Sequence, residues 1–258
     1  MVNLSKMGCI FYGAAIAGIG LQAMYCHQLP YILQLPQHTG PTSQAVLAVI
    51  FGAVFTLAGA AIISAKNARQ TSLLFAGLLL LLFCFYYIPY QFLSGTGYTQ
   101  VGEWENAAKE LTLAGGAFVI AGCFTAKNED KLTRFLSKLV RFGAILFAIT
   151  MMYYGILHFL FAKEAATMIP VWIPGHMFWM YFCGIALFGS GVAIILNIST
   201  RVIAALLGTM IFIWFIALHI PRVVAAATAD LPGEITSAFF AFAYSGIAFV
   251  VSGSAGRK

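Results

Sequence analysis

Charged residues are scarce in this chain of 258 residues. Only 9% of them are Asp, Glu, Lys or Arg, against about a quarter in an average soluble domain. Hydrophobic residues make up 61%, so too few polar side chains remain to cover a soluble surface. Strict polar–apolar alternation, the pattern of a transmembrane β-barrel, is also missing. The composition therefore predicts an all-α integral membrane protein.

Signatures of common enzymes are missing as well. The chain has no G-x-S-x-G, no H-E-x-x-H, no phosphate-binding glycine loop and no dinucleotide fingerprint. Its five cysteines are scattered and form no C-x-x-C pair, so they are expected to be small buried hydrophobic residues rather than a metal or dithiol site. No basic stripe with interleaved aromatic residues occurs, which argues against a nucleic-acid partner. These absences leave open whether the protein is an enzyme.

What is present is a series of long apolar runs, most of which reach the roughly 20 residues that a helix needs to cross a bilayer. The eight runs are residues 7–29, 43–65, 70–94, 110–126, 139–162, 177–200, 202–221 and 235–253. The first run is expected to be retained, because no small-x-small cleavage site follows it. We therefore expect a helical bundle of eight transmembrane helices.

The distribution of Lys and Arg predicts the orientation of these helices. With a cytoplasmic N-terminus, eleven of the 14 basic residues fall on the cytoplasmic side. The outer side then holds Lys109, Lys163 and Arg222. This arrangement predicts that both termini are cytoplasmic, and it favours contact with anionic membrane lipid.

An internal repeat is visible when the chain is shifted by 131–132 residues. The matched landmarks are Gly52 with Gly184, Gly59 with Gly191, Arg69 with Arg201, Pro89 with Pro221, Gly115 with Gly246 and His27 with His158. Two parallel four-helix repeats follow, residues 1–126 and 139–258, joined by a charged cytoplasmic linker, residues 127–138. The glycines are expected to let helices approach closely, and the prolines to end the third span of each unit.

Polar residues concentrate at the expected outer ends of the spans, where they are costly and therefore informative. The second unit is richer in them, since it has His219 and Arg222 where the first has Tyr87 and Tyr90. We expect an outer-leaflet pocket there, with histidines as polar anchors, Arg222 as the group that orients a ligand, and aromatic side chains as an apolar wall. The candidate ligand-binding residues are His158, His219, Arg222, Trp172, Phe159, His176 and Glu164. Arg222 could instead pair with Glu164 or Glu234.

Several interpretations of the histidines remain open. They could hydrogen-bond a quinone-like molecule, ligate a haem as an axial pair, or be interfacial side chains within an ordinary aromatic belt. A small-solute or lipid carrier is a second functional class, because parallel repeats are compatible with alternating access. It is disfavoured by the expectation that no ionisable residue lies near the bilayer midplane. A purely structural membrane protein is the third.

The second unit resembles the DoxX family of small four-helix bacterial membrane proteins, over roughly residues 139–253. The resemblance rests on the segments 155–159 (GILHF) and 169–174 (IPVWIP), on Gly184, Gly191 and Arg201, and on 219–221 (HIP). The family is usually a single four-helix unit, whereas this chain is doubled. The resemblance implies a bacterial inner-membrane protein that acts as a subunit or scaffold of a redox system, since the family is similar to a subunit of thiosulfate:quinone oxidoreductase. It implies an oxidoreductase partner and a quinone as the possible cofactor, but no catalytic residue.

Overall fold

The computed structural model describes residues 4–30, 41–93, 104–126 and 129–255, and these residues form helices and turns without a strand. The helices of the first half are α1 (Leu4–Cys26), α2 (Pro41–Ile63), α3 (Ala68–Leu82), the π-helical segment η2 (Phe83–Tyr87), α4 (Ile88–Leu93) and α5 (Glu105–Ala121). Those of the second half are α6 (Lys131–Ser137), the 3-10 segment η4 (Val140–Phe142), α7 (Gly143–Leu160), α8 (Ala162–Ala166), α9 (His176–Ile195), α10 (Thr200–Trp214), the π-helical segment η5 (Phe215–His219), α11 (Ile220–Ala225) and α12 (Leu231–Ser254).

Seven helical stretches in the described part of the chain are long and apolar enough to cross a membrane. Continuous helices count together here, so that α3 to α4, α6 to α7, and α10 to α11 each form one stretch. The remaining expected span corresponds to α5, which has 17 residues. Many large apolar side chains are exposed, for example Leu57 at 70% and Ile185 at 65%. The chain is therefore an all-helical, multi-pass membrane protein.

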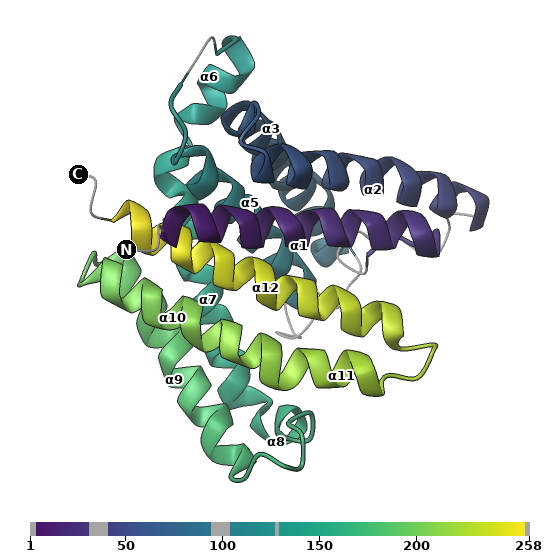
Figure 1. Ribbon diagram of the computed structural model, residues 1–258, viewed down its shortest axis with the longest axis vertical. Coiled ribbons are helices and arrows are strands. Elements are labelled where there is room, and N and C mark those ends of the chain that lie inside the picture. The colour runs from purple at the N-terminus through teal and green to yellow at the C-terminus, as the bar shows by residue number, and fades with distance from the viewer. Residues whose placement is uncertain (1–3, 31–40, 94–103, 127–128, 256–258) are drawn as a thin grey trace.

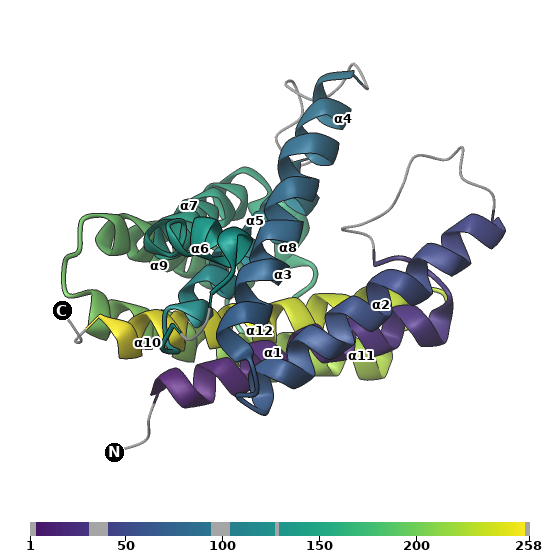
Figure 2. The same cartoon turned by 90° about the horizontal axis from the view of Figure 1, so that it is seen from above.

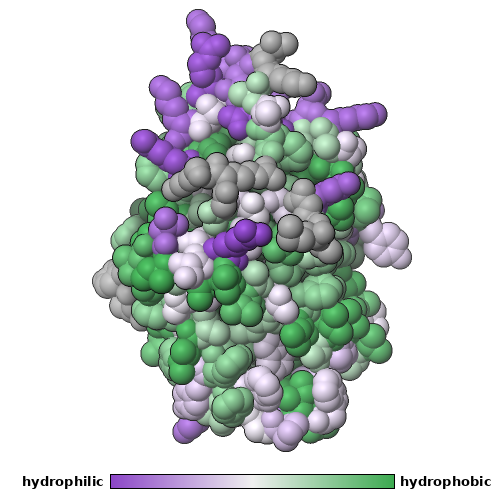
Figure 3. All heavy atoms as spheres, turned by 60° about the vertical axis from the view of Figure 1, so that its left-hand side comes forward, coloured by the Kyte–Doolittle hydropathy of each residue, from purple (hydrophilic) through white to green (hydrophobic). Residues whose placement is uncertain are grey.

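Hydrophilic side chains gather at one end of the molecule, over α6, while much of the remaining surface in the same view is apolar (Figure 3). The sequence predicts this charged stretch, residues 127–138, as a linker. The structure differs in that its described part contains the helix α6. The Asp130 side chain begins this helix by accepting a hydrogen bond from the backbone N–H of Thr133 at 2.9 Å. Leu136 then packs against Gly77 of α3, so the segment is part of the packed structure.

The two prolines at the outer ends of the third spans do not end their helices, contrary to the prediction. Pro89 lies in α4 and Pro221 in α11, and each of these helices continues the helix before it. In both places a π-helical segment, η2 or η5, comes directly before the short helix that contains the proline. Proline lacks the N–H that an α-helix requires, and a widened turn accommodates the missing hydrogen bond without ending the helix.

Helices from the two halves of the chain pack against one another. α1 lies between α2 and α12, and α7 contacts both α9 and α5. Within the halves, α3 packs on α5 and α10 on α12. Figures 1 and 2 show α1, α2, α11 and α12 running in similar directions, whereas α8 with α9, and α3 with α4, point elsewhere. One consequence of this packing is that Cys9 of α1 lies beside Cys123, just beyond α5, although the two are far apart in sequence.

Glycines allow the closest helix contacts, as the sequence predicts. A Cβ atom added to Gly20 of α1 would lie 2.5 Å from the carbonyl oxygen of Gly52 in α2. The same test at Gly155 of α7 gives 2.8 Å to the carbonyl oxygen of Gly184 in α9. Because real Cβ atoms do not approach backbone oxygens so closely, a larger residue at either position would force the helices apart.

Candidate functional site

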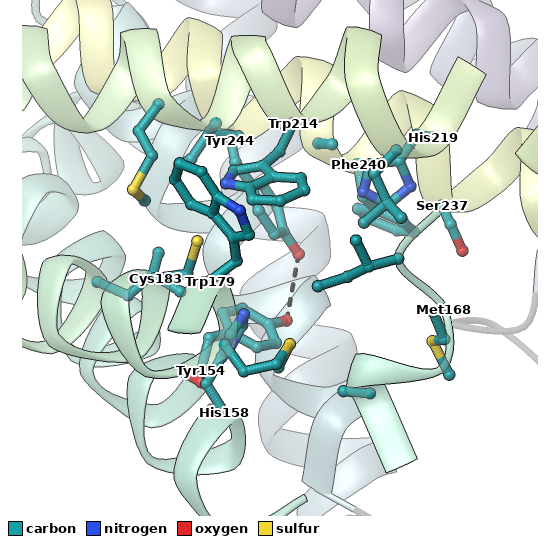
Figure 4. Close-up of a pocket in the computed structure, with 18 of the residues that line it drawn as sticks. Tyr154, His158, Met168, Trp179, Cys183, Trp214, His219, Ser237, Phe240 and Tyr244 are labelled. Carbon is teal, nitrogen blue, oxygen red and sulfur yellow. Dashed lines mark hydrogen bonds between the residues drawn. The ribbon is translucent and has the colours of Figure 1, made fainter. Parts of the chain in front are cut away.

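A cavity of about 350 Å³ lies between the second half of α7, the first half of α9, the end of α10 with η5, and the first half of α12. Its walls come from α7, α9, α10, η5 and α12, with a further contribution from α5 (Figure 4). Most of the lining is apolar, including Met151, Met180, Leu187 and Phe240. A concave, mainly apolar cavity with a few polar groups is the usual form of a small-molecule site.

Two histidines line this cavity from different walls. His158, three residues after the close contact at Gly155, is held on α7 by a hydrogen bond of 2.8 Å between its Nδ1 and the carbonyl oxygen of Tyr154. A carbonyl can only accept, so Nδ1 carries the proton and Nε2 of the neutral ring is an acceptor. His219 comes from η5, and its buried Nδ1 has no hydrogen-bond partner. The cavity is therefore lined by one acceptor and by one imidazole with an unused nitrogen.

A pair of tyrosines joins two walls of the cavity. The hydroxyl groups of Tyr154 on α7 and Tyr244 on α12 lie 3.2 Å apart, and the pair is visible at the centre of Figure 4. Because Tyr154 also offers its carbonyl to His158, the backbone and the side chain of one residue orient two polar groups of the site.

Two tryptophans form an aromatic wall. The rings of Trp179 on α9 and Trp214 on α10 lie 5.8 Å apart at 78°, an edge-to-face arrangement. The indole N–H of Trp179 donates to the carbonyl oxygen of Pro174 at 3.1 Å, which fixes the ring beside the turn before α9. Figure 4 shows Cys183 beside Trp179, with Tyr154 below the two indoles.

The first half of the chain contributes to the site, which the sequence does not predict. Glu105 and Lys109 of α5 line the cavity and form an ion pair of 2.6 Å one turn apart. The cavity is consequently built from both halves, although most of its residues lie in the second.

Of the seven residues predicted to bind a ligand, only His158 and His219 line the cavity. Phe159 follows His158 directly on α7, where consecutive side chains point about 100° apart, and it lies outside the cavity lining. Phe159 instead stacks on Tyr181 and is 42% exposed. Trp172 is exposed in the turn before α9. The tryptophan of this region that lines the cavity is Trp179.

The other three predicted residues also lie outside the cavity lining. Glu164 is exposed on α8, and His176 is the first residue of α9. Arg222 is near His219 but forms an ion pair with Glu234: its Nε donates to Oε2 at 2.8 Å, and its Nη2 donates to Oε1. Glu234 is one of the two partners that the sequence suggests for Arg222, and the ion pair connects α11 to α12.

His27 does not have the position in the first half that His158 has in the second. His158 lies three residues after Gly155, and the residue three positions after the corresponding contact, Gly20, is Ala23. His27 lies beyond the end of α1, is exposed, and has a left-handed backbone with φ of 50°. With respect to these two glycine contacts, His27 lies about one helical turn further along the chain than His158 does.

The cavity residues that the sequence analysis missed have a recognisable spacing. Tyr154 and His158 on α7, and Trp179 and Cys183 on α9, are each four residues apart, a spacing that places both members on one face. Polar and aromatic residues grouped by helix face, rather than by depth alone, include these pairs.

Comparison with protein-family models, with curated proteins and with solved structures finds no match to this chain.

Proposed function

We propose that the cavity binds a quinone-like amphipathic molecule, and that the protein acts as an inner-membrane subunit or scaffold of a redox system. The observation that carries the proposal is the placement of His158 and His219 on a mainly apolar cavity of about 350 Å³. This volume lies within the range of small-molecule sites, roughly 300–1,000 Å³. An oxidoreductase is the partner that such a subunit requires.

The chemistry of the two imidazoles suits both states of a quinone head group. His158 Nε2 can accept a hydrogen bond from a hydroxyl of the reduced form. His219 can donate an N–H to a carbonyl of the oxidised form, since its Nδ1 has no other partner. Trp179 and Trp214 offer flat apolar faces against which a ring packs.

Binding of a quinone analogue to the purified protein tests this proposal. A His158→Ala/His219→Ala double variant should bind at least about tenfold more weakly, because each lost hydrogen bond in a buried site costs on the order of 1 kcal/mol. His27→Ala is the matched control, since His27 is exposed and lies outside the cavity. Unchanged binding by the double variant would contradict the proposal. A haem absorption band in the purified protein would replace the quinone by haem as the ligand.

The proposal includes eight membrane-spanning helices in two parallel four-helix units, with both termini cytoplasmic. Two repeated features support the two units. The π-helical segments begin at Phe83 and Phe215, which are 132 positions apart. Left-handed residues occur before the third span of each unit, at Asn67 and at Ser199, again 132 positions apart. The charged surface over α6 supports a cytoplasmic connection between the units (Figure 3).

A carrier for a small solute or lipid is the second candidate, and one observation favours it. Glu110, at the beginning of the expected span 110–126, is completely buried within α5. A buried ionisable residue in a membrane protein is often part of a transport pathway. Solute uptake into proteoliposomes that is lost in a Glu110→Gln variant would favour the carrier over the redox subunit.

A further inference from the structure

Glu110 is the only acidic side chain that is fully buried in the described part of the chain. It lies in the second turn of α5, and neither of its carboxyl oxygens has a hydrogen-bond partner. An ionised carboxylate in such surroundings would cost several kcal/mol even after the protein relaxes around it. Glu110 therefore needs a bound positive charge or a bound proton.

The surroundings of Glu110 contain a second unsatisfied polar group. Tyr87 is the last residue of the π-helical segment η2, is 6% exposed, and its hydroxyl has no hydrogen-bond partner. η2 packs against α5, and Tyr87 interacts electrostatically with Glu110. Two buried polar groups without hydrogen-bond partners thus lie on neighbouring helical segments.

No cation in the described residues forms an ion pair with the carboxyl group of Glu110. Lys109 is next in sequence, but it lines the histidine cavity and pairs with Glu105. A metal ion would need further ligands, and the described residues contain no group of three His, Cys, Asp or Glu side chains that could hold one.

We propose that Glu110, with Tyr87 beside it, is a buried proton-binding site in the first half of the chain. The ligand is a single proton, held as the neutral carboxylic acid of Glu110. The site is separate from the histidine cavity, but the two are related in position. Tyr87 ends η2 as His219 ends η5, so each π-helical segment carries a polar side chain to a buried site.

Proton exchange at Glu110 requires movement of the surrounding helices. Release of the proton would leave an unpaired charge in an apolar environment. Exchange with solvent therefore requires that α3 and α4 separate from α5, or that water enters between them. Proton exchange at Glu110 is thereby coupled to a change in the packing of the first unit.

Infrared spectroscopy of the full-length protein in lipid nanodiscs tests the proposal. At neutral pH, the wild-type spectrum should contain the carbonyl band of a protonated carboxylic acid, and Glu110→Gln should lose it. Glu105→Gln is the matched control and should keep the band, since Glu105 is 46% exposed and ion-paired. Absence of this band from the wild-type spectrum would overturn the proposal, whether or not the variants fold.

A second variant separates proton binding from a merely structural role. Tyr87→Phe removes a polar hydroxyl group beside the carboxylic acid of Glu110. The carbonyl band should therefore shift in frequency relative to the wild type, while its intensity stays the same. A band that is identical in Tyr87→Phe would show that Tyr87 does not adjoin the proton-binding group. In that case the site as proposed would be wrong.

Discussion

Gly155 determines how closely α7 approaches α9, and hence where His158 lies three residues further along. A methyl group at this position would meet the carbonyl oxygen of Gly184 and the backbone nitrogen of Phe188, both at 2.8 Å. We expect Gly155→Ala to lower the free energy of unfolding by about 1–3 kcal/mol, the usual cost of overpacking. Thermal unfolding in detergent measures this effect.

Gly189 provides the control for that substitution. It lies on the same helix pair, in α9, but nothing lies within 4 Å of an added Cβ atom. Gly189→Ala should leave stability unchanged or raise it by up to about 1 kcal/mol, because alanine favours helices. Equal destabilisation by both substitutions would contradict the close contact between α7 and α9.

Among the elements, α6 is capped at its beginning by one side chain, Asp130. The Asp130 carboxylate accepts hydrogen bonds from the hydroxyl and the backbone N–H of Thr133, and these bonds lower the pKa of Asp130 below its ordinary value of 3.8. Since the pKa is lower in the folded state, the stabilisation is fully present above 3.8. It is lost as the pH falls through the lowered folded value.

We therefore expect hydrogen-exchange protection of α6 to fall at acidic pH, before that of the apolar spans. Asp130→Ala should show the reduced protection already at neutral pH, whereas Asp130→Asn should keep most of it, because asparagine also caps helices well. If α6 is equally protected in all three proteins, the capping interaction does not hold this helix.

The helices themselves are largely predictable from the sequence, and their faces are not. Apolar runs define the spans because a bilayer requires about 20 apolar residues, and each expected run overlaps an observed helix. The π-helical segments are missed, because a widened turn depends on packing around Pro89 and Pro221 as well as on the prolines themselves. The partner of Cys9 is missed as well, because only the folded arrangement brings Cys123 beside it.

At the scale of the whole molecule, the histidine cavity depends on helices from both halves packing together. α5 illustrates this, because its Glu105 and Lys109 line a cavity whose other walls belong to the second half. The sequence predicts the outer clustering of polar residues, and with it His158 and His219. It does not predict the cavity walls, because these come from contacts between segments that are distant in the chain, such as α5 with α7.

The central claim, that this cavity holds a quinone-like molecule, is tested most directly by native mass spectrometry of protein extracted gently from its own membrane. The wild-type protein should carry the added mass of a quinone, and the His158→Ala/His219→Ala variant should lose it while His27→Ala keeps it. The claim would be contradicted if the wild-type protein carried only bulk phospholipid and could not be distinguished from the double variant.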